Sequence, residues 1–398
     1  MNKTPKLRFK EFSGDWEIKK LGELGEFKKT YSFSRSLEGE GNYKHIHYGD
    51  IHMNYKGIIS KDKLIPSIDI PSDDNYEFIQ DRDIIFADAS EDRKDLGKVA
   101  VVRNIEGNIL SGLHTLCFRP KEDLNSEFFL SHSLNKEYLK FMYTRGNGAK
   151  VLGISKSNLS EYKFLAPSKE EQEKIASFFS LIDDKISLQG EKVEALKDYK
   201  KGMMQKIFSR ELRFKDDDGR DYPEWEEKKL GDIAECLDNK RKPLNSTERV
   251  EMKGSIPYYG ANGVVDFVND YIFDEDIILL AEDGGNFDDF ATKPIAQFVT
   301  GKSWVNNHAH VLRAKYNAEF LFYSLVHKDI RKYINGTSRA KLNKSDMLDI
   351  VVNVPKSLKE QKKIADTLGA IYSKIEKEQE KLDYLNGYKK GLLQQMFV

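Results

Sequence analysis

Two segments of this chain are repeated within it, and the repeat limits the possible fold more than any other feature. Residues 168–208 return as residues 357–397, an offset of 189, and 18 of the 41 aligned positions are identical. Residues 16–24 likewise return as residues 225–233, an offset of 209. Self-similarity of this kind indicates that one structural unit is used twice. We therefore expect a fold with internal pseudo-two-fold symmetry.

The longer repeated segments have the pattern of two long helices. Each opens with a serine followed three residues later by a glutamate, Ser168 with Glu171 and Ser357 with Glu360, which is the pattern of a capping box. From Ile175 onward, apolar residues follow at alternating spacings of four and three, a heptad seam that both copies share. A seam at this period favours another helix as its partner. We expect the two copies to pack antiparallel, because the domain between them must return the chain.

Polar residues and glycines stand at equivalent places in the two helices. The polar seam residues are Gln189, Lys200, Glu378 and Lys389. Either they are tolerated where the seam is partly exposed, or they specify the register at a cost in stability. A glycine inside a helix costs about 1 kcal/mol relative to alanine. Gly202 and Gly391 therefore predict the close approach of another surface, either within this chain or on a partner protein.

Between the repeated segments lie two stretches, residues 28–150 and 237–341, that match poorly. Each contains short apolar runs separated by turns and then a segment with helical spacing, residues 125–143 in the first stretch and 318–334 in the second. Strands followed by a helix predict a compact α+β domain in each stretch. The expected fold class is therefore α+β, with two globular domains separated by two long antiparallel coiled-coil helices.

The repeat also divides the chain into four parts. We assign residues 1–167 to an N-terminal segment and the first domain, 168–210 to the first shared helix, 211–355 to the second domain and 356–398 to the second shared helix.

Composition excludes several classes of protein. The chain has 64 Lys and Arg against 65 Asp and Glu, so it is not the strongly basic body typical of many nucleic-acid binders. Its longest apolar runs, such as residues 277–281, are too short to span a membrane, and its first residues lack the apolar core of a secretion signal. Two cysteines, Cys117 and Cys236, suggest neither a disulfide framework nor a zinc cluster. We expect a cytoplasmic protein that binds a polyanion, if at all, through local clusters.

Such clusters occur at equivalent places, where the chain enters and leaves each variable domain. Glycines let a backbone approach phosphate, while Arg, Lys, Ser and Asn donate to phosphates and base edges. One cluster alone is more often a solvated loop, but its recurrence in both halves favours a DNA interface. The candidate DNA-binding residues are Lys28, Lys29, Tyr31, Ser34, Arg35, Arg145, Asn147, Lys150, Lys240, Arg241, Lys242, Tyr259, Asn262, Ser338, Arg339 and Lys341.

Catalytic motifs are weak or missing. The chain has no Gly-rich phosphate loop and no amino-methyltransferase motif. Asp92 and Lys94 loosely match the acid-x-Lys group of nucleases, a triplet that arises often in so charged a chain. Two His-x-His pairs, at residues 45–47 and 308–310, have no further ligands at matching positions, so we interpret these histidines as structural. We expect a chain without a catalytic site, a metal or a cofactor of its own.

The pattern resembles the DNA specificity subunits of type I restriction-modification systems. The resemblance covers nearly the whole chain and is carried by duplicated motifs together with the segment Pro-Tyr-Tyr-Gly-Ala-Asn-Gly at residues 257–263. The duplicated motifs are Glu-Gln-x-Lys-Ile-Ala (171–176 and 360–365), Tyr-Lys-Lys-Gly (199–202 and 388–391) and Trp-Glu-x-Lys-Lys-Leu-Gly (16–22 and 225–231). It implies that each variable domain is a target-recognition domain reading one half of a bipartite, asymmetric sequence in double-stranded DNA. The paired helices would set the unread spacer.

The same resemblance implies partners and their cofactors. Two modification (methyltransferase) subunits using S-adenosylmethionine would dock on the helices, and restriction subunits using ATP and Mg²⁺ for translocation and cleavage would join them. The helix ends offer candidate docking residues, which either contact these subunits or pack internally: Tyr199, Met203, Ile207, Phe208, Tyr388, Leu392, Met396 and Phe397. Two alternatives remain open on the residues alone, a non-catalytic coiled-coil adaptor with two protein-binding heads and a metal-dependent nuclease.

Overall fold

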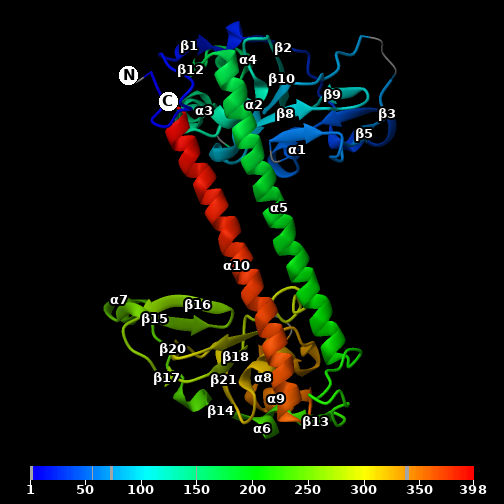
Figure 1. The fold of residues 1–398 in the computed structure, drawn as a ribbon, viewed down its shortest axis with the longest axis vertical. Helices are drawn as coiled ribbons and strands as arrows, with labels where there is room; N and C mark the ends of the chain where they lie inside the picture. Colours follow the sequence, from blue (N-terminus) through cyan, green and yellow to red (C-terminus); the bar gives the residue numbers. More distant parts are fainter. Residues whose placement is uncertain (1–2, 56, 72–74, 149, 337–339) are drawn as a thin grey trace. The chain divides into compact units, whose positions relative to one another are not determined.

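The computed structural model describes residues 3–55, 57–71, 75–148, 150–336 and 340–398, and the chain forms two compact units. The first unit comprises Met1–Gly190 with Glu380–Val398, and the second comprises Glu191–Gln379. Each unit therefore contains one β-rich domain, part of the helix that follows it in the chain and part of the other long helix (Figure 1).

The main sheets of the two units share one strand order, which confirms the repeat. The first unit has the order β2-β10-β6-β8-β4 and the second has β14-β21-β18-β19, so β2, β10, β6 and β8 correspond to β14, β21, β18 and β19. The strands of the first are β2 (Gly25–Phe27), β10 (Thr115–Pro120), β6 (Ile84–Ala87), β8 (Val99–Arg103) and β4 (Ile58–Ser60). Those of the second are β14 (Ala234–Cys236), β21 (Ala309–Ala314), β18 (Ile277–Ala281) and β19 (Ala296–Val299).

Each unit has a second sheet, and these second sheets differ more between the two domains than the main sheets do. The order is β5-β3-β9 in the first unit and β16-β15-β20-β17 in the second, with one parallel pair in each, β3 with β9 and β15 with β20. The strands are β5 (Ser67–Ile68), β3 (Glu38–Ile46), β9 (Ile109–Ser111), β16 (Gly263–Val268), β15 (Lys253–Gly260), β20 (Lys302–Val305) and β17 (Phe273–Asp274).

Short strand pairs and helices complete the units. Pairs form between β1 (Glu17–Lys20) and β12 (Lys163–Ala166), β7 (Ala89–Ser90) and β11 (Leu152–Gly153), β13 (Glu226–Lys229) and β24 (Val351–Val354), and β22 (Ile334–Asn335) and β23 (Lys341–Leu342). The short helices are α1 (Tyr48–Met53), α2 (Ser126–His132), α3 (Lys136–Arg145), α4 (Lys156–Ser160), α6 (Leu230–Ile233), α7 (Ser246–Glu251), α8 (Ala318–Leu325) and α9 (Lys344–Leu348).

The helix expected in each variable domain is shorter than its spacing predicted. Residues 125–143 form α2 and α3 with a break between them, because the Asn135 side chain accepts from the amide of Tyr138 and starts a new helix. In the second unit α8 ends at Leu325, and a 3₁₀ turn at Arg331–Tyr333 follows. The prediction of one continuous helix was wrong in both domains.

The two long helices are α5 (Lys169–Phe208) and α10 (Leu358–Met396), and they run antiparallel within each unit. In the first unit Asp183 of α5 pairs with Lys389 of α10 at 2.5 Å; in the second, Lys192 of α5 pairs with Glu378 of α10, also at 2.5 Å. Every expected seam position is buried or half-buried. The seam and the antiparallel direction are thus confirmed.

The helix starts hold only half of each expected capping box. The amides of Glu171 and Glu360 donate to the serine hydroxyls, at 3.4 and 3.5 Å. The two glutamate side chains accept from other donors: Arg8 donates to Glu171 at 2.7 Å, and the indole of Trp225 donates to Glu360 at 3.0 Å. The repeated glutamates therefore fasten each helix start to the N-terminal segment of its own unit.

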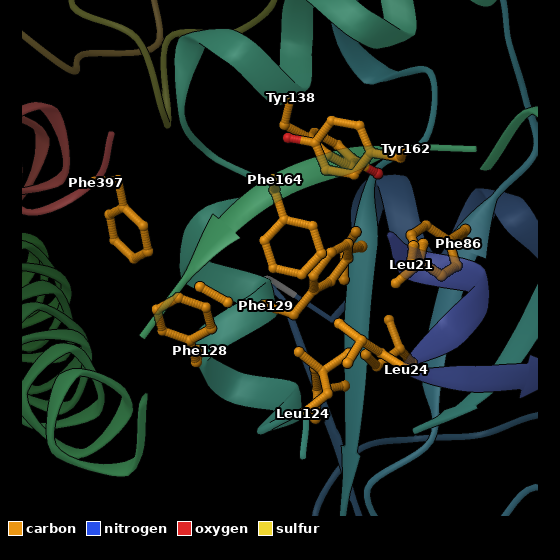
Figure 2. Close-up of a cluster of buried hydrophobic side chains, with 14 of the residues drawn as sticks. Leu21, Leu24, Phe86, Leu124, Phe128, Phe129, Tyr138, Tyr162, Phe164 and Phe397 are labelled. Atoms are coloured by element: carbon orange, nitrogen blue, oxygen red, sulfur yellow. The ribbon is translucent and has the colours of Figure 1, made fainter. Parts of the chain in front are cut away.

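Each core combines the domain with both long helices. Figure 2 shows Phe397, at the end of α10, beside Phe128 in the first unit, where Trp16 also packs. In the second unit Phe208, at the end of α5, takes the equivalent place against Trp225 and Phe320. The first domain is thus completed by a helix end from the far end of the chain, and the second by the end of the helix that directly precedes it.

The helix glycines have no close neighbour. A Cβ atom added at Gly202 or Gly391 would meet nothing within 4 Å. An approach by another part of this chain is therefore not the reason for these glycines, and the approach of a partner surface stays a prediction. Within the described ranges, no helix is both long and apolar enough to span a membrane.

Candidate nucleic-acid interface

In the second unit the entrance and exit loops meet at one carboxylate. Arg241, from the entrance loop, pairs with Glu282 at 2.6 Å, and Lys341, from the exit loop, pairs with the same carboxylate at 3.1 Å. Although burial opposes it, the hydrogen bonds from Arg241 and Lys341 lower the pKa of Glu282. Residues separated by 100 positions in the sequence are thus brought together at the end of β18.

A buried histidine extends this network. His310 is 1% exposed; its Nδ1 lies 2.6 Å from Asp238 and its Nε2 lies 2.8 Å from the carbonyl of Leu342. Burial raises the pKa of Asp238, but the bonds from His310 and the amide of Val311 outweigh it and hold that pKa below its usual value. Asp238, Glu282 and His310 have the spacing of a metal site. The guanidinium of Arg241 lies against both carboxylates, so the acidic charge is already compensated.

An open hollow of about 380 Å³ lies beside this network. The turn at residues 260–265 lines it together with Asp283, Asn306 and His308. The side chain of Asn262 is exposed and donates to the carbonyl of Gly284 at 2.8 Å. His308 lies 2.6 Å from Asp283. The hollow offers amide, imidazole and backbone groups on an exposed surface, which are the groups that read base edges.

In the first unit the entrance loop is packed into an aromatic cluster. Tyr31 stacks on Phe33 at 5.6 Å and meets Tyr76 edge-on at 5.3 Å. Lys28 pairs with Glu26 and Glu77, and the ammonium of Lys29 lies 5.1 Å from the centre of the Tyr31 ring. Stacked aromatics and paired cations order this loop before any ligand binds.

Arg35 and Ser34 are also engaged. Arg35 pairs with the buried Asp50 at 2.7 Å, and its own side chain remains 45% exposed. Ser34 exchanges a hydrogen bond with Ser36. Nearby, His47 accepts from the amide of Gly49 and starts α1, and burial lowers the pKa of His47. These contacts explain His47 as a structural residue.

The helix that follows the exit loop of the first unit, α4, contacts the entrance loop. Lys156, which follows the exit loop, donates to the carbonyl of Lys28 at 2.9 Å. Asn147 pairs through its backbone with Gly153, and its side chain is exposed, as are Arg145 and Lys150. The exit loop itself meets the entrance loop in the second unit, whereas in the first unit the contact is made by α4, which follows the exit loop.

The candidate residues fall into two groups. Lys28, Arg35, Arg241 and Lys341 are held in ion pairs. Within the described part of the chain, the exposed cations without an ion pair are Lys29, Arg145, Lys150, Lys240 and Lys242. Tyr259 is half-buried, and burial raises its pKa. Ser338 and Arg339 lie outside the described residues.

Sequence reasoning missed the acid beside each equivalent histidine. His114 lies 3.1 Å from Asp88 in the first unit, as His308 lies beside Asp283 in the second. The sequence does indicate that the two histidines are equivalent, because they stand at matching distances from Arg119 and Arg313, but it gives no sign of the acids. Asp92, considered above for nuclease chemistry, accepts from the amide of Lys94 and starts a 3₁₀ turn.

The candidate docking residues divide by exposure. Tyr199 and Tyr388, at equivalent positions of α5 and α10, are 56% and 48% exposed. Met203 and Phe208 are half-buried. The remaining four belong to the cores of their own units: Ile207, Leu392, Met396 and Phe397.

A known family matches this chain over most of its length. The model of the type I restriction modification DNA specificity domain matches residues 13–198 and again residues 222–386. The chain therefore belongs to this family and contains two such domains. The family provides DNA specificity and is not catalytic, so this chain serves as the subunit that gives a type I restriction-modification system its sequence specificity.

The individual proteins that this chain resembles are also type I specificity subunits. The chain is 26% identical to the putative type I restriction enzyme MjaX specificity subunit of Methanocaldococcus jannaschii, over 98% of this chain and 94% of that protein. It is 36% identical to a putative type I specificity subunit of Haemophilus influenzae, but over only 37% of each chain. Its fold is similar to that of the crystallised type I S subunit of M. genitalium, with a TM-score of 0.65, 19% identity and 99% coverage of both chains.

Proposed function

We propose that each unit reads one half of an asymmetric, bipartite sequence in double-stranded DNA. The observation that carries the proposal is the contact of each entrance loop with the segment by which the chain leaves the domain, the exit loop through Glu282 in the second unit and Lys156 of α4 in the first. Exposed cations would position the DNA backbone, while the turn that carries Asn262 would read base edges. The surfaces of the two units differ in sequence, so their half-sites would differ.

Variants confined to one unit test this proposal. Lys242→Ala and Asn262→Ala in the second unit should relax or weaken recognition of one half-site, because each removes a donor from an exposed loop. Arg145→Ala and Lys150→Ala should do the same for the other half-site. Sequencing of methylated DNA from cells carrying each variant reports both half-sites at once. Variants that change both half-sites, or neither, would contradict the division of labour.

The paired helices would determine the number of unread base pairs between the half-sites. Removing one heptad from each helix at equivalent positions shortens each by about 10 Å, since an α-helix rises 1.5 Å per residue. DNA rises ~3.4 Å per base pair. The spacer should therefore shorten by about three base pairs, while both half-sites stay the same. Altered half-sites with an unchanged spacer would show that the helices do not set the spacing.

Two modification subunits would dock on equivalent surfaces around Tyr199 with Gly202 and Tyr388 with Gly391, and restriction subunits would join that core. S-adenosylmethionine, ATP and Mg²⁺ would be bound by those partners. Two glycines that face open space beside exposed tyrosines support this docking surface. Gly202→Ala and Gly391→Ala should each stabilise the isolated chain by about 1 kcal/mol and weaken association with the modification subunit. Unchanged association, measured by sedimentation velocity, would exclude this surface.

A further inference from the structure

A cleft in the second unit includes one candidate docking residue, Phe208, but its charged residues make none of the contacts described above. It has a volume of about 560 Å³ and lies between α5 on one side and α8 with the loop between β18 and β19 on the other. Phe208, Phe290 and Tyr323 provide aromatic walls. The charged residues that line it are the cations Lys197, Lys200, Lys201 and Lys328 and the acids Glu194 and Asp198. Four cations against two carboxylates leave the cleft positive.

Most of this positive charge is not compensated inside the chain. Lys197 pairs with Glu194 at 2.7 Å. Over the residues that the structure describes, Lys200, Lys201 and Lys328 have no ion pair; the ammonium of Lys200 lies instead 4.2 Å from the centre of the Tyr372 ring. Burial lowers the pKa of Lys200 and of Lys328. Ammonium groups are thus drawn partly out of water without a carboxylate that would offset the loss of hydration.

The first unit contains the equivalent cleft, and there the charge is compensated. Lys389 stands 189 residues after Lys200 and pairs with Asp183 at 2.5 Å. The position equivalent to Asp183 is occupied in the second unit by Tyr372. The cleft around Lys389 has a volume of only about 190 Å³. The two copies of one fold therefore differ at the neighbour of the equivalent lysine, which is Asp183 in the first unit and Tyr372 in the second, and the smaller cleft is the one that contains the ion pair.

We propose that the cleft of the second unit binds a small phosphate-bearing molecule about the size of a nucleotide. Its volume lies within the range of small-molecule sites, ~300–1,000 Å³. A phosphate concentrates negative charge in one small group, so one ligand can satisfy Lys200, Lys201 and Lys328, and lysine binds phosphate as a point charge. The rings of Phe290 and Tyr323 suit a planar, apolar ligand body. The proposal is independent of the DNA-reading surface.

Calorimetric titration of the full chain with ATP, and separately with inorganic pyrophosphate, tests the site. We expect one binding site for ATP at low ionic strength. Lys200→Met should weaken binding about tenfold or more, since it removes a charge-assisted contact and keeps the apolar stem. Tyr372→Asp should weaken it similarly, because it recreates the ion pair of the first unit. Lys389→Met is the matched control and should leave the affinity unchanged.

Four results would overturn the proposal. They are no binding of either ligand at millimolar concentration, equal weakening by Lys389→Met, binding of citrate but not of ATP, and binding of duplex DNA with the same dependence on Lys200. The last two would assign the cleft to carboxylates or to the DNA interface. Tyr372 packs on Tyr323 with ring centres 5.2 Å apart, so Tyr372→Asp can unfold the unit. If circular dichroism shows unfolding, Lys200→Met and its control decide alone.

Discussion

Phe397 lies one residue from the C-terminus, yet it belongs to the core of the N-terminal unit. Its side chain is 7% exposed, and its ring centre lies 5.4 Å from that of Phe128 and 6.3 Å from that of Trp16. Replacing a buried phenylalanine by alanine costs about 3–5 kcal/mol, and we take the lower bound of about 3 kcal/mol. In a unit of about 200 residues this lowers the melting temperature by about 6–12 °C.

The matched variant is Phe208→Ala, at the equivalent position of α5 in the second unit. Phe208 is half-buried against Trp225 and Phe320, so we expect a smaller loss confined to the second unit. Hydrogen exchange followed by mass spectrometry measures the two units separately in one sample. Phe397→Ala should accelerate exchange in β6, β8 and β10, and Phe208→Ala should do so in β18 and β21. A change of less than 1 kcal/mol for Phe397→Ala, or equal loosening of both units by either variant, would refute this account of the cores.

Three further predictions concern particular contacts. In urea unfolding, Trp225→Phe should destabilise the chain by about 1–3 kcal/mol more than Trp16→Phe. The reason is that Trp225 donates to the buried Glu360, while the indole nitrogen of Trp16 has no partner among the described residues; equal losses would contradict this. Burial lowers the pKa of His132 to about 3. The contribution of this histidine to stability is therefore complete above about pH 6.5 and is lost as the pH falls, by about 2 kcal/mol at pH 5. His132→Phe should flatten this part of the profile of stability against pH, and an unchanged profile would exclude His132 as the cause of the loss. Four candidate cations are already paired: Lys28, Arg35, Arg241 and Lys341. Anisotropy titrations of the isolated chain with DNA should therefore give a slope of log K against log salt no steeper than about −4. Tight binding with a much steeper slope would show that these ion pairs open on DNA.

The repeat made the architecture predictable. The two helices share one heptad seam, so each can pack against the other. In the antiparallel arrangement Asp183 meets Lys389 and Lys192 meets Glu378. The strand order was not predictable, because short apolar runs give no information about which strands become neighbours. The two breaks between expected helical turns, after His132 and after Leu325, depend on caps that spacing alone does not reveal.

The sequence suggested candidate site residues but not the contacts that they make. It does not show that Glu282 holds both Arg241 and Lys341. Glu171 and Glu360 fit a capping box equally well, and only tertiary structure brings Arg8 and Trp225 to them. In each case the partner comes from a distant part of the chain, which spacing along the sequence does not reveal.

The ion-paired cations bear on how this chain reaches specificity. A free surface lysine adds affinity for any DNA sequence, whereas a cation fixed by a carboxylate is positioned before the DNA arrives and contributes less net charge. Arg35 on Asp50 and Arg241 on Glu282 are of the second kind. A chain with 64 basic and 65 acidic residues therefore suits a recognition subunit that selects between sequences and receives non-specific affinity from its partners. The two lysine clefts differ in the same way. Asp183 compensates the charge of Lys389, whereas Lys200 keeps its charge for a ligand.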